Sequence, residues 1–138
     1  GGVLLAHAMF ELPLFQVSTH ARAGGAQLLS EAVATFGLLA VILGTARRRS
    51  AAVPFAVGAY ITAAYWFTAS TSFANPAVTL ARSFTDTFAG IRPVDAPGFV
   101  LAQIVGAGLA AVCFRWLVPS LPEAATNIVA REPDDIDP

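Results

Sequence analysis

The feature of this sequence that most constrains its fold is the tripeptide Asn75-Pro76-Ala77, which lies between two stretches apolar enough to cross a membrane. Asn is a favoured N-cap, and Pro is favoured at the first helical position, where its missing N–H is not needed. The sequence therefore predicts a half-helix over residues 76–90, which is too short to span a bilayer. A helix that begins within a membrane must be packed in protein or face a cavity, because free backbone ends are not tolerated in hydrocarbon.

The composition is that of a helical membrane protein. Hydrophobic residues make up 56% of the 138 residues and charged residues only 12%, about half of the charged share usual in soluble domains. Apolar runs of about 20 residues recur along the chain, and each is long enough for a membrane helix. The net charge of −1 gives no reason to expect a nucleic-acid partner, and the single cysteine excludes a disulfide framework. We therefore predict an all-α membrane protein in a lipid bilayer, with no metal or other cofactor.

Turn residues and charges divide the chain into segments. Residues 1–15 are predicted to be the end of a transmembrane helix, and residues 16–25 a polar extracellular loop. Residues 26–118 would hold three spans and the half-helix. Residues 119–138 form an acidic tail without helical periodicity, for which we predict disorder. Because the chain opens on Gly1 inside an apolar run, we expect it to be part of a longer protein.

Three consecutive arginines, Arg47 to Arg49, predict the orientation in the membrane. Short loops rich in Arg stay on the cytoplasmic side. Loop 47–50 and the C-terminus are therefore expected in the cytoplasm, and loop 16–25 outside. The protein would then be a multi-pass protein of the plasma membrane, which is the inner membrane of a bacterium.

The motif Asn75-Pro76-Ala77, with Ser-Phe-Ala before it and Val after it, resembles the second Asn-Pro-Ala motif of the aquaporin (major intrinsic protein) family. Glu31 matches the acidic residue that anchors the re-entrant loop in that family, and Gln103-Ile-Val-Gly106-Ala107 matches the sixth-helix pattern. The resemblance covers residues 1–118. It implies an aquaporin-like right-handed helix bundle, of which this chain is the second inverted repeat, from the end of helix three through helix six.

The resemblance implies a passive channel rather than an enzyme, acting in a full-length parent that forms a homotetramer. Its partners would be water and small uncharged solutes. Asn75 would donate its amide N–H groups to the passing solute, and the dipole of the half-helix would help to exclude protons. Pro76 and Ala77 would shape the contact between two half-helices. Glu31 would accept hydrogen bonds from backbone N–H groups of the loop before Asn75.

The selectivity filter departs from the family pattern. Most members place Arg directly after Asn-Pro-Ala, where this sequence has Val78. Arg82, one helical turn later, could reach back toward the constriction or pair with Asp86, and we favour a place in the outer vestibule. Ser72 would supply a small polar wall. Tyr65 and Ala63 are the candidates from the fifth helix, ahead of Trp66, although Tyr65 could equally belong to an interfacial aromatic belt.

A constriction lined by Val78 and Ser72 suggests solutes larger than water, such as glycerol-like polyols and neutral metalloid hydroxides including arsenous acid. The run from Asn75 to Arg82 also resembles a bacterial branch associated with arsenical resistance. The loop residues His20 and Arg22 are a further option for the rim of the vestibule.

The first alternative is a half-domain of a secondary transporter, because broken helices and inverted repeats also occur there. A transporter should carry more buried charge at the helix break than Glu31 alone. An integral-membrane enzyme would need clustered His, Asp or Glu at one membrane depth, and the sequence has no such cluster.

Overall fold

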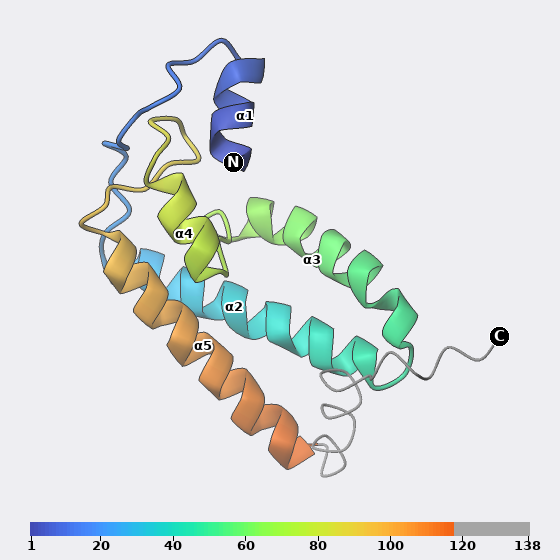
Figure 1. Cartoon of the computed structure of the whole chain (residues 1–138). Helices are drawn as coiled ribbons and strands as arrows, with labels where there is room; N and C mark the ends of the chain where they lie inside the picture. The colour runs from blue at the N-terminus through green and yellow to red at the C-terminus, as the bar shows by residue number, and fades with distance from the viewer. Residues whose placement is uncertain (118–138) are drawn as a thin grey trace, which may run out of the picture.

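The computed structural model describes residues 1–117, so the acidic tail predicted over residues 119–138 lies outside the described residues. No strand occurs between residues 1 and 117, and the prediction of an all-α fold is confirmed. The elements, labelled in Figure 1, are α1 (Gly2–Met9), α2 (Gly25–Ala46), the 3-10 turn η1 (Ser50–Ala52), α3 (Val53–Phe67), α4 (Pro76–Arg82) and α5 (Ala96–Leu117). Within residues 1–117, three helical stretches are long and apolar enough to cross a membrane, namely α2, η1 with α3, and α5. The chain is therefore a multi-pass membrane protein.

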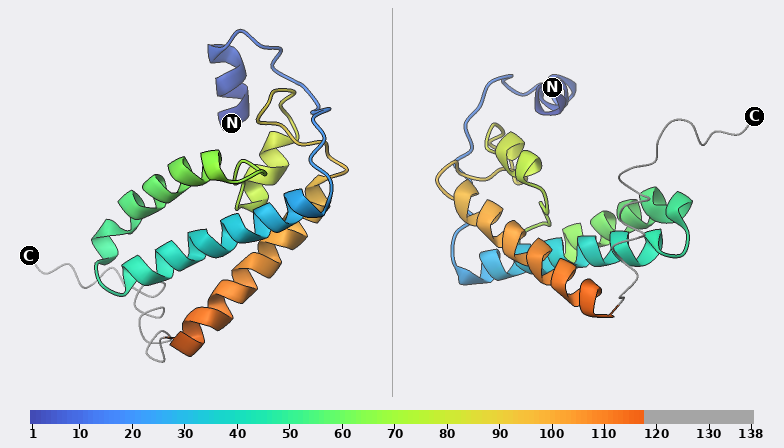
Figure 2. Two further views of the ribbon diagram at one scale, coloured as in Figure 1. Left: turned by 180° about the vertical axis from the view of Figure 1, so that it is seen from behind. Right: turned by 60° about the horizontal axis from the view of Figure 1, so that its bottom comes forward.

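α2 is the central helix of the bundle. It packs against both α5 and α3, with α5 running in the same direction and α3 returning antiparallel to it (Figure 1). Both views in Figure 2 show the short α4 near the end of the bundle where α2 and α5 begin and α3 finishes. The break between α3 and α4 therefore lies at the end of the bundle where these three long helices meet.

Small residues allow the long helices to approach closely. A Cβ added at Gly106 of α5 would overlap the backbone of Ala32 in α2, so the two helices touch there at the backbone level. Gly37 of α2 leaves space for the ring of Tyr60, whose hydroxyl donates to the carbonyl of Ala34 at 2.9 Å. Close backbone approach at Gly is a common way for membrane helices to pack.

The connection between α1 and α2 is tied to the segment between α4 and α5. The N–H of Ser18 donates to the carbonyl of Ser83 at 2.9 Å. The N–H and the hydroxyl of Thr19 both donate to the carboxylate of Asp86, at 2.8 and 2.9 Å. These hydrogen bonds, first that from the N–H, hold the pKa of Asp86 below its usual value. The ionised carboxylate therefore joins two loops that lie far apart in the sequence.

The prediction of a half-helix over residues 76–90 is wrong in its end. α4 stops at Arg82, because the residues that follow bind partners outside the helix. The N–H of Ile91 reaches back to the carbonyl of Arg82 at 3.3 Å, while Asp86 binds the loop before α2. Ser83, Thr85 and Thr87 also favour non-helical backbone, because their hydroxyls compete for backbone groups.

Other boundaries shift by smaller amounts. α1 ends at Met9 rather than near residue 15, and Glu11 then takes a left-handed backbone with φ of 56°. α5 begins at Ala96 rather than at residue 99, because the carbonyl of Asp95 accepts the N–H of Phe99 and so opens the helix earlier.

The contact at Gly106 can be tested by substitution. We expect Gly106→Val to lower the free energy of unfolding by roughly 1–3 kcal/mol, because the new side chain must push α2 and α5 apart. Thermal unfolding of the detergent-solubilised protein would measure the change. Gly108→Val is the matched control, since a Cβ at Gly108 meets nothing within 4 Å. Equal destabilisation by both variants would contradict the contact.

Candidate functional site

Asn75 caps α4 with one end of its side chain and leaves the other end free. Its Oδ1 accepts hydrogen bonds from the N–H groups of Ala77 at 2.8 Å and Val78 at 3.3 Å. Asn75 is exposed, and within the part of the chain that the structure describes its side-chain NH2 group has no partner. The cap fixes the amide in one orientation, so two N–H donors point away from the helix.

The loop before Asn75 has an unfavourable backbone conformation. Thr71, Ser72 and Ala74 have φ values of 59°, 47° and 48°, in the left-handed region that residues with a Cβ rarely adopt. Such residues cost of order 1–3 kcal/mol each and persist only where the surroundings hold them. The site must therefore contain contacts that keep this loop in place.

Glu31 of α2 supplies the main contacts to the loop. Its side chain is fully buried. The N–H of Phe73 donates to Oε2 at 3.2 Å, and the N–H of Ala74 donates to Oε1. A carboxylate that accepts hydrogen bonds from two consecutive backbone N–H groups fixes the backbone conformation there. Glu31 therefore determines the position of Asn75, which follows directly in the loop.

Gln103 of α5 completes this network. Its Nε2 donates to Oε1 of Glu31 at 2.8 Å and to the hydroxyl of Thr79 at 2.8 Å. That hydroxyl in turn donates to the backbone carbonyl of Asn75 at 3.0 Å. Gln103 and Thr79 are almost completely buried. One chain of hydrogen bonds therefore joins α2, α5 and α4 behind the exposed amide.

Val78 lies next to the apolar core of this end of the bundle. The core consists of Phe73, Ile91 and Phe99, with the rings of Phe73 and Phe99 5.2 Å apart, and the half-buried Val78 packs against it. Part of the Val78 side chain is thus used for packing. Its role as a wall of the constriction stays a prediction.

Arg82 is directed back toward the Asn75 loop. Its guanidinium lies 4.3 Å from the centre of the Phe73 ring and 5.9 Å from that of Tyr65, and one nitrogen donates to the hydroxyl of Thr71 at 3.4 Å. Asp86 binds Thr19 instead, so the role favoured from the sequence, in which Arg82 pairs with Asp86 in the outer vestibule, is wrong.

Ser72 and Tyr65 have different surroundings from those expected. Ser72 is only 5% exposed, and its hydroxyl is enclosed without a partner among the described residues, so it does not form an open polar wall in this chain. Tyr65 is half-buried, with its ring edge-to-face against those of Trp66 and Phe88. Its place beside Arg82 suits a filter residue, and that role stays a prediction.

Two further polar residues are buried: Arg22, which the sequence offered only as an option for the rim of the vestibule, and His7, which it did not place in the site. Arg22 is 4% exposed, and burial, followed by the positive charge of Arg82, lowers the pKa of its guanidinium. His7 of α1 is 2% exposed and lies 2.9 Å from the hydroxyl of Thr85. The three carbonyl partners of Arg22 and the Thr85 partner of His7 are distant in the sequence, so no local pattern could reveal these contacts.

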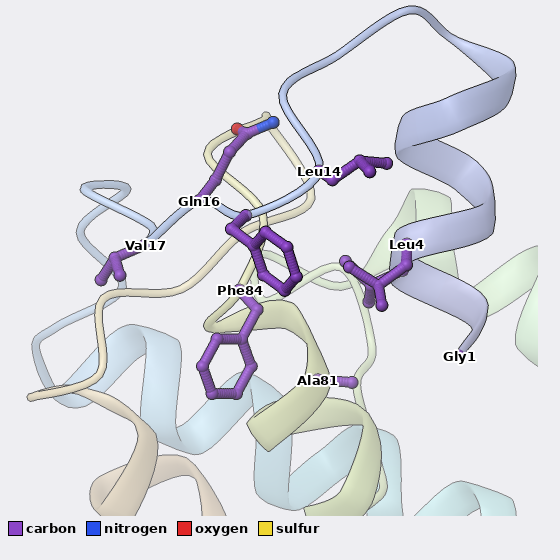
Figure 3. A pocket seen from close by; sticks show the side chains of 9 residues that line it. Gly1, Leu4, Leu14, Gln16, Val17, Ala81 and Phe84 are labelled. Atoms are coloured by element: carbon purple, nitrogen blue, oxygen red, sulfur yellow. The ribbon is translucent and has the colours of Figure 1, made fainter.

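An open apolar hollow of about 530 Å³ lies beside α4. Figure 3 shows Leu4 of α1, Leu14 and Phe84 around it. None of the predicted site residues lines this hollow, so it is distinct from the Asn75 site. Among residues 1–117, no three His, Cys, Asp or Glu side chains gather as metal ligands.

A short capped helix, held by a buried carboxylate among membrane-length helices, defines a multi-pass membrane protein with a broken helix. Comparison with known proteins gives its family. The chain is 62% identical over 122 residues to aquaglyceroporin AqpS of Rhizobium meliloti (strain 1021), a match that covers 88% of this chain and 52% of that protein. The chain thus spans about half the length of this relative, and it belongs to the aquaporin (major intrinsic protein) family, whose members are channels rather than enzymes.

Two further comparisons add no relative. No family model matches the chain, and no solved structure gives a significant match.

The network behind Asn75 predicts a specific sensitivity at Gln103. We expect Gln103→Leu to lower the free energy of unfolding by about 1–3 kcal/mol, because a buried carboxylate loses a donor. Thermal unfolding in detergent would measure this. Gln27→Leu is the matched control, since Gln27 is only half-buried and its side chain makes a single hydrogen bond, to the carbonyl of Ala69. A Gln103→Leu protein as stable as the control would contradict a supporting role for the network.

Proposed function

We propose that this chain forms the second half of a passive channel for water and small uncharged solutes, in a full-length membrane protein. The observation that carries the proposal is the side chain of Asn75, whose carbonyl is committed to the cap while its NH2 group stays exposed. A relative named as an aquaglyceroporin supports glycerol-like solutes as well as water.

Asn75 would bind the oxygen of each passing molecule through its two amide N–H donors. A water molecule that accepts a hydrogen bond from Asn75 turns its own hydrogens toward the neighbouring water molecules. This orientation opposes proton transfer along the single file of water in the pore. α4 has only seven residues, so its dipole is smaller than that of the longer helix expected from the sequence. The fixed amide of Asn75 would therefore contribute more to the exclusion of protons than the N-terminus of α4.

The outer constriction would be formed by Val78, Arg82 and Tyr65. A polyol has hydroxyl groups along a carbon backbone, so it needs both a polar and an apolar wall. Arg82 and the hydroxyl of Thr71 would supply the polar wall, and Val78 with the ring of Tyr65 the apolar one. The positive charge of Arg82 would oppose cations. Neutral arsenous acid, which carries three hydroxyl groups, fits the same description.

The orientation and assembly belong to the same proposal. The loops around Asn75 lie at one end of the bundle and Arg47 to Arg49 follow the other end of α2 (Figure 1), so the arginine loop and the C-terminus would face the cytoplasm. The full-length protein would be a homotetramer in the plasma membrane, with one pore in each protomer.

Osmotic flux tests the proposal. Proteoliposomes carrying the full-length channel would be challenged with sucrose and followed by stopped-flow light scattering. We expect fast water flux that falls several-fold in Asn75→Asp, which keeps the N-cap but has no N–H to donate. Asn75→Ala should lose the flux and also about 1 kcal/mol of stability, because it removes the cap. Absence of water and solute flux in the unmodified channel would contradict the proposal.

The same vesicles test the filter with glycerol and arsenous acid gradients. We expect both solutes to re-swell the vesicles, and Val78→Arg to abolish this re-swelling while water flux continues, because a second guanidinium would narrow the constriction. Val78→Leu is the control for added volume without charge. Unchanged glycerol entry in Val78→Arg would remove Val78 from the filter.

A further inference from the structure

Arg22 lies in the connection between α1 and α2, yet its side chain is buried against two other segments. Its Nε donates to the carbonyl of Gly90 at 2.7 Å, and its two terminal nitrogens donate to the carbonyls of Ser70 at 3.0 Å and Phe88 at 2.7 Å. Ser70 belongs to the strained loop that leads to Asn75, and the other two acceptors to the segment after α4. One guanidinium therefore joins the loops on both sides of α4.

Arg22 and Arg82 share one aromatic neighbour. The guanidinium carbon of Arg22 is 5.0 Å from the centre of the Phe73 ring, and that of Arg82 is 4.3 Å from the same centre. Both distances are within the range of a cation–π contact. The ring itself cannot move aside, since it is 4% exposed and packs against Phe99.

The two guanidinium groups differ in how firmly they are held. Arg22 uses its side-chain nitrogens on three carbonyl oxygens. Among the residues that the structure describes, Arg82 makes a single long hydrogen bond, to Thr71 at 3.4 Å, and no ion pair. The position of Arg82 thus depends on its surroundings, namely the rings of Phe73 and Tyr65 and the loop at Thr71. The fixed positive charge of Arg22 adds repulsion.

We propose that Arg22 is a positioning residue of the outer constriction: through the Ser70 carbonyl, the Phe73 ring and charge repulsion, it fixes the Arg82 guanidinium and thereby sets the preference between solutes. This inference rests on the proposed channel function. It assigns the selectivity of the outer mouth to a pair of arginines on different segments, of which only Arg82 touches the solute.

The chemistry of Arg explains why this position needs more than a positive charge. The planar guanidinium presents N–H groups in a fixed fork, so it can bind three carbonyl oxygens that lie in different directions. A Lys at position 22 keeps the charge but has one nitrogen for the three carbonyls. Arg22→Lys should therefore keep the charge repulsion on Arg82 but lose part of the hydrogen bonding to the loops. Its effect should lie between that of Arg22→Gln and no change.

The test is a double-variant cycle on solute preference. The full-length channel in proteoliposomes would be measured for glycerol and water permeability in four forms: unmodified, Arg22→Gln, Arg82→Ala and the double variant. The readout is the glycerol-to-water permeability ratio, which does not depend on how many channels fold or insert. Arg92→Gln is the matched control: Arg92 lies between α4 and α5, pairs with Asp95 and, among residues 1–117, makes no cation–π contact with Phe73.

We expect Arg22→Gln to raise the glycerol-to-water permeability ratio at least about threefold, which exceeds the usual deviation from additivity between independent sites. Arg22→Lys should give a ratio between that of Arg22→Gln and that of the unmodified channel. The double variant should have the ratio of Arg82→Ala alone, because Arg22 acts through Arg82. Independent, multiplying effects of the two substitutions, or an unchanged ratio in Arg22→Gln, would overturn the proposal.

Two further outcomes are distinguishable. If Arg22→Gln does not insert into membranes, the same cycle is run with Arg22→Lys, and an unchanged ratio there overturns the proposal. If the unmodified channel carries neither water nor glycerol, the channel function itself fails. Flux with no coupling between the arginines leaves the channel function in place and removes only the role of Arg22.

Discussion

The buried carboxylate of Glu31 is the interaction on which this end of the molecule depends. A carboxylate in a membrane-length helix is costly unless its oxygens are hydrogen-bonded. Here it accepts from the backbone of Phe73 and Ala74 and from the side chain of Gln103. These bonds offset both its burial and the left-handed backbone of the loop. Glu31 thus couples the stability of the bundle to the position of Asn75.

A second set of contacts organises the outer end. The loop before α2 binds the segment after α4 through Asp86 and Arg22, while α4 itself is too short to hold its position by helical hydrogen bonds alone. The site therefore has two supports: a polar network behind Asn75, within the bundle, and a frame of loops around Arg82. The first would fix where a solute binds, and the second which solute enters.

The sequence was sufficient to predict the features that local chemistry determines. Apolar runs of membrane length predicted the long helices, and Asn75-Pro76 marked the start of α4. The carboxylate at Glu31 stood out because an acid in an apolar span needs partners. These signals are local, since each depends on residues a few positions apart or on the cost of burying one charge.

The features that escaped prediction depend on contacts between distant segments. α4 ends at Arg82 because the chain beyond it binds the loop of residues 16–24, about 65 positions earlier. The acceptors of Arg22 are likewise 48 to 68 positions away. Ser72 is enclosed because the loop turns with left-handed backbone, which its amino-acid type does not indicate. Periodicity and capping rules contain no information on such pairings.

The most direct test of the role of Glu31 is residue-resolved hydrogen–deuterium exchange of the Phe73 and Ala74 amides in the full-length channel. Bonded to a buried carboxylate beside a water-filled pore, both amides should exchange slowly. In Glu31→Gln, which can accept through one oxygen only, at least one should exchange about tenfold faster or more, while the amides of α5 stay unchanged. Equally slow exchange of both amides in the variant would show that the loop holds its conformation without the carboxylate, and would contradict the dependence of Asn75 on Glu31.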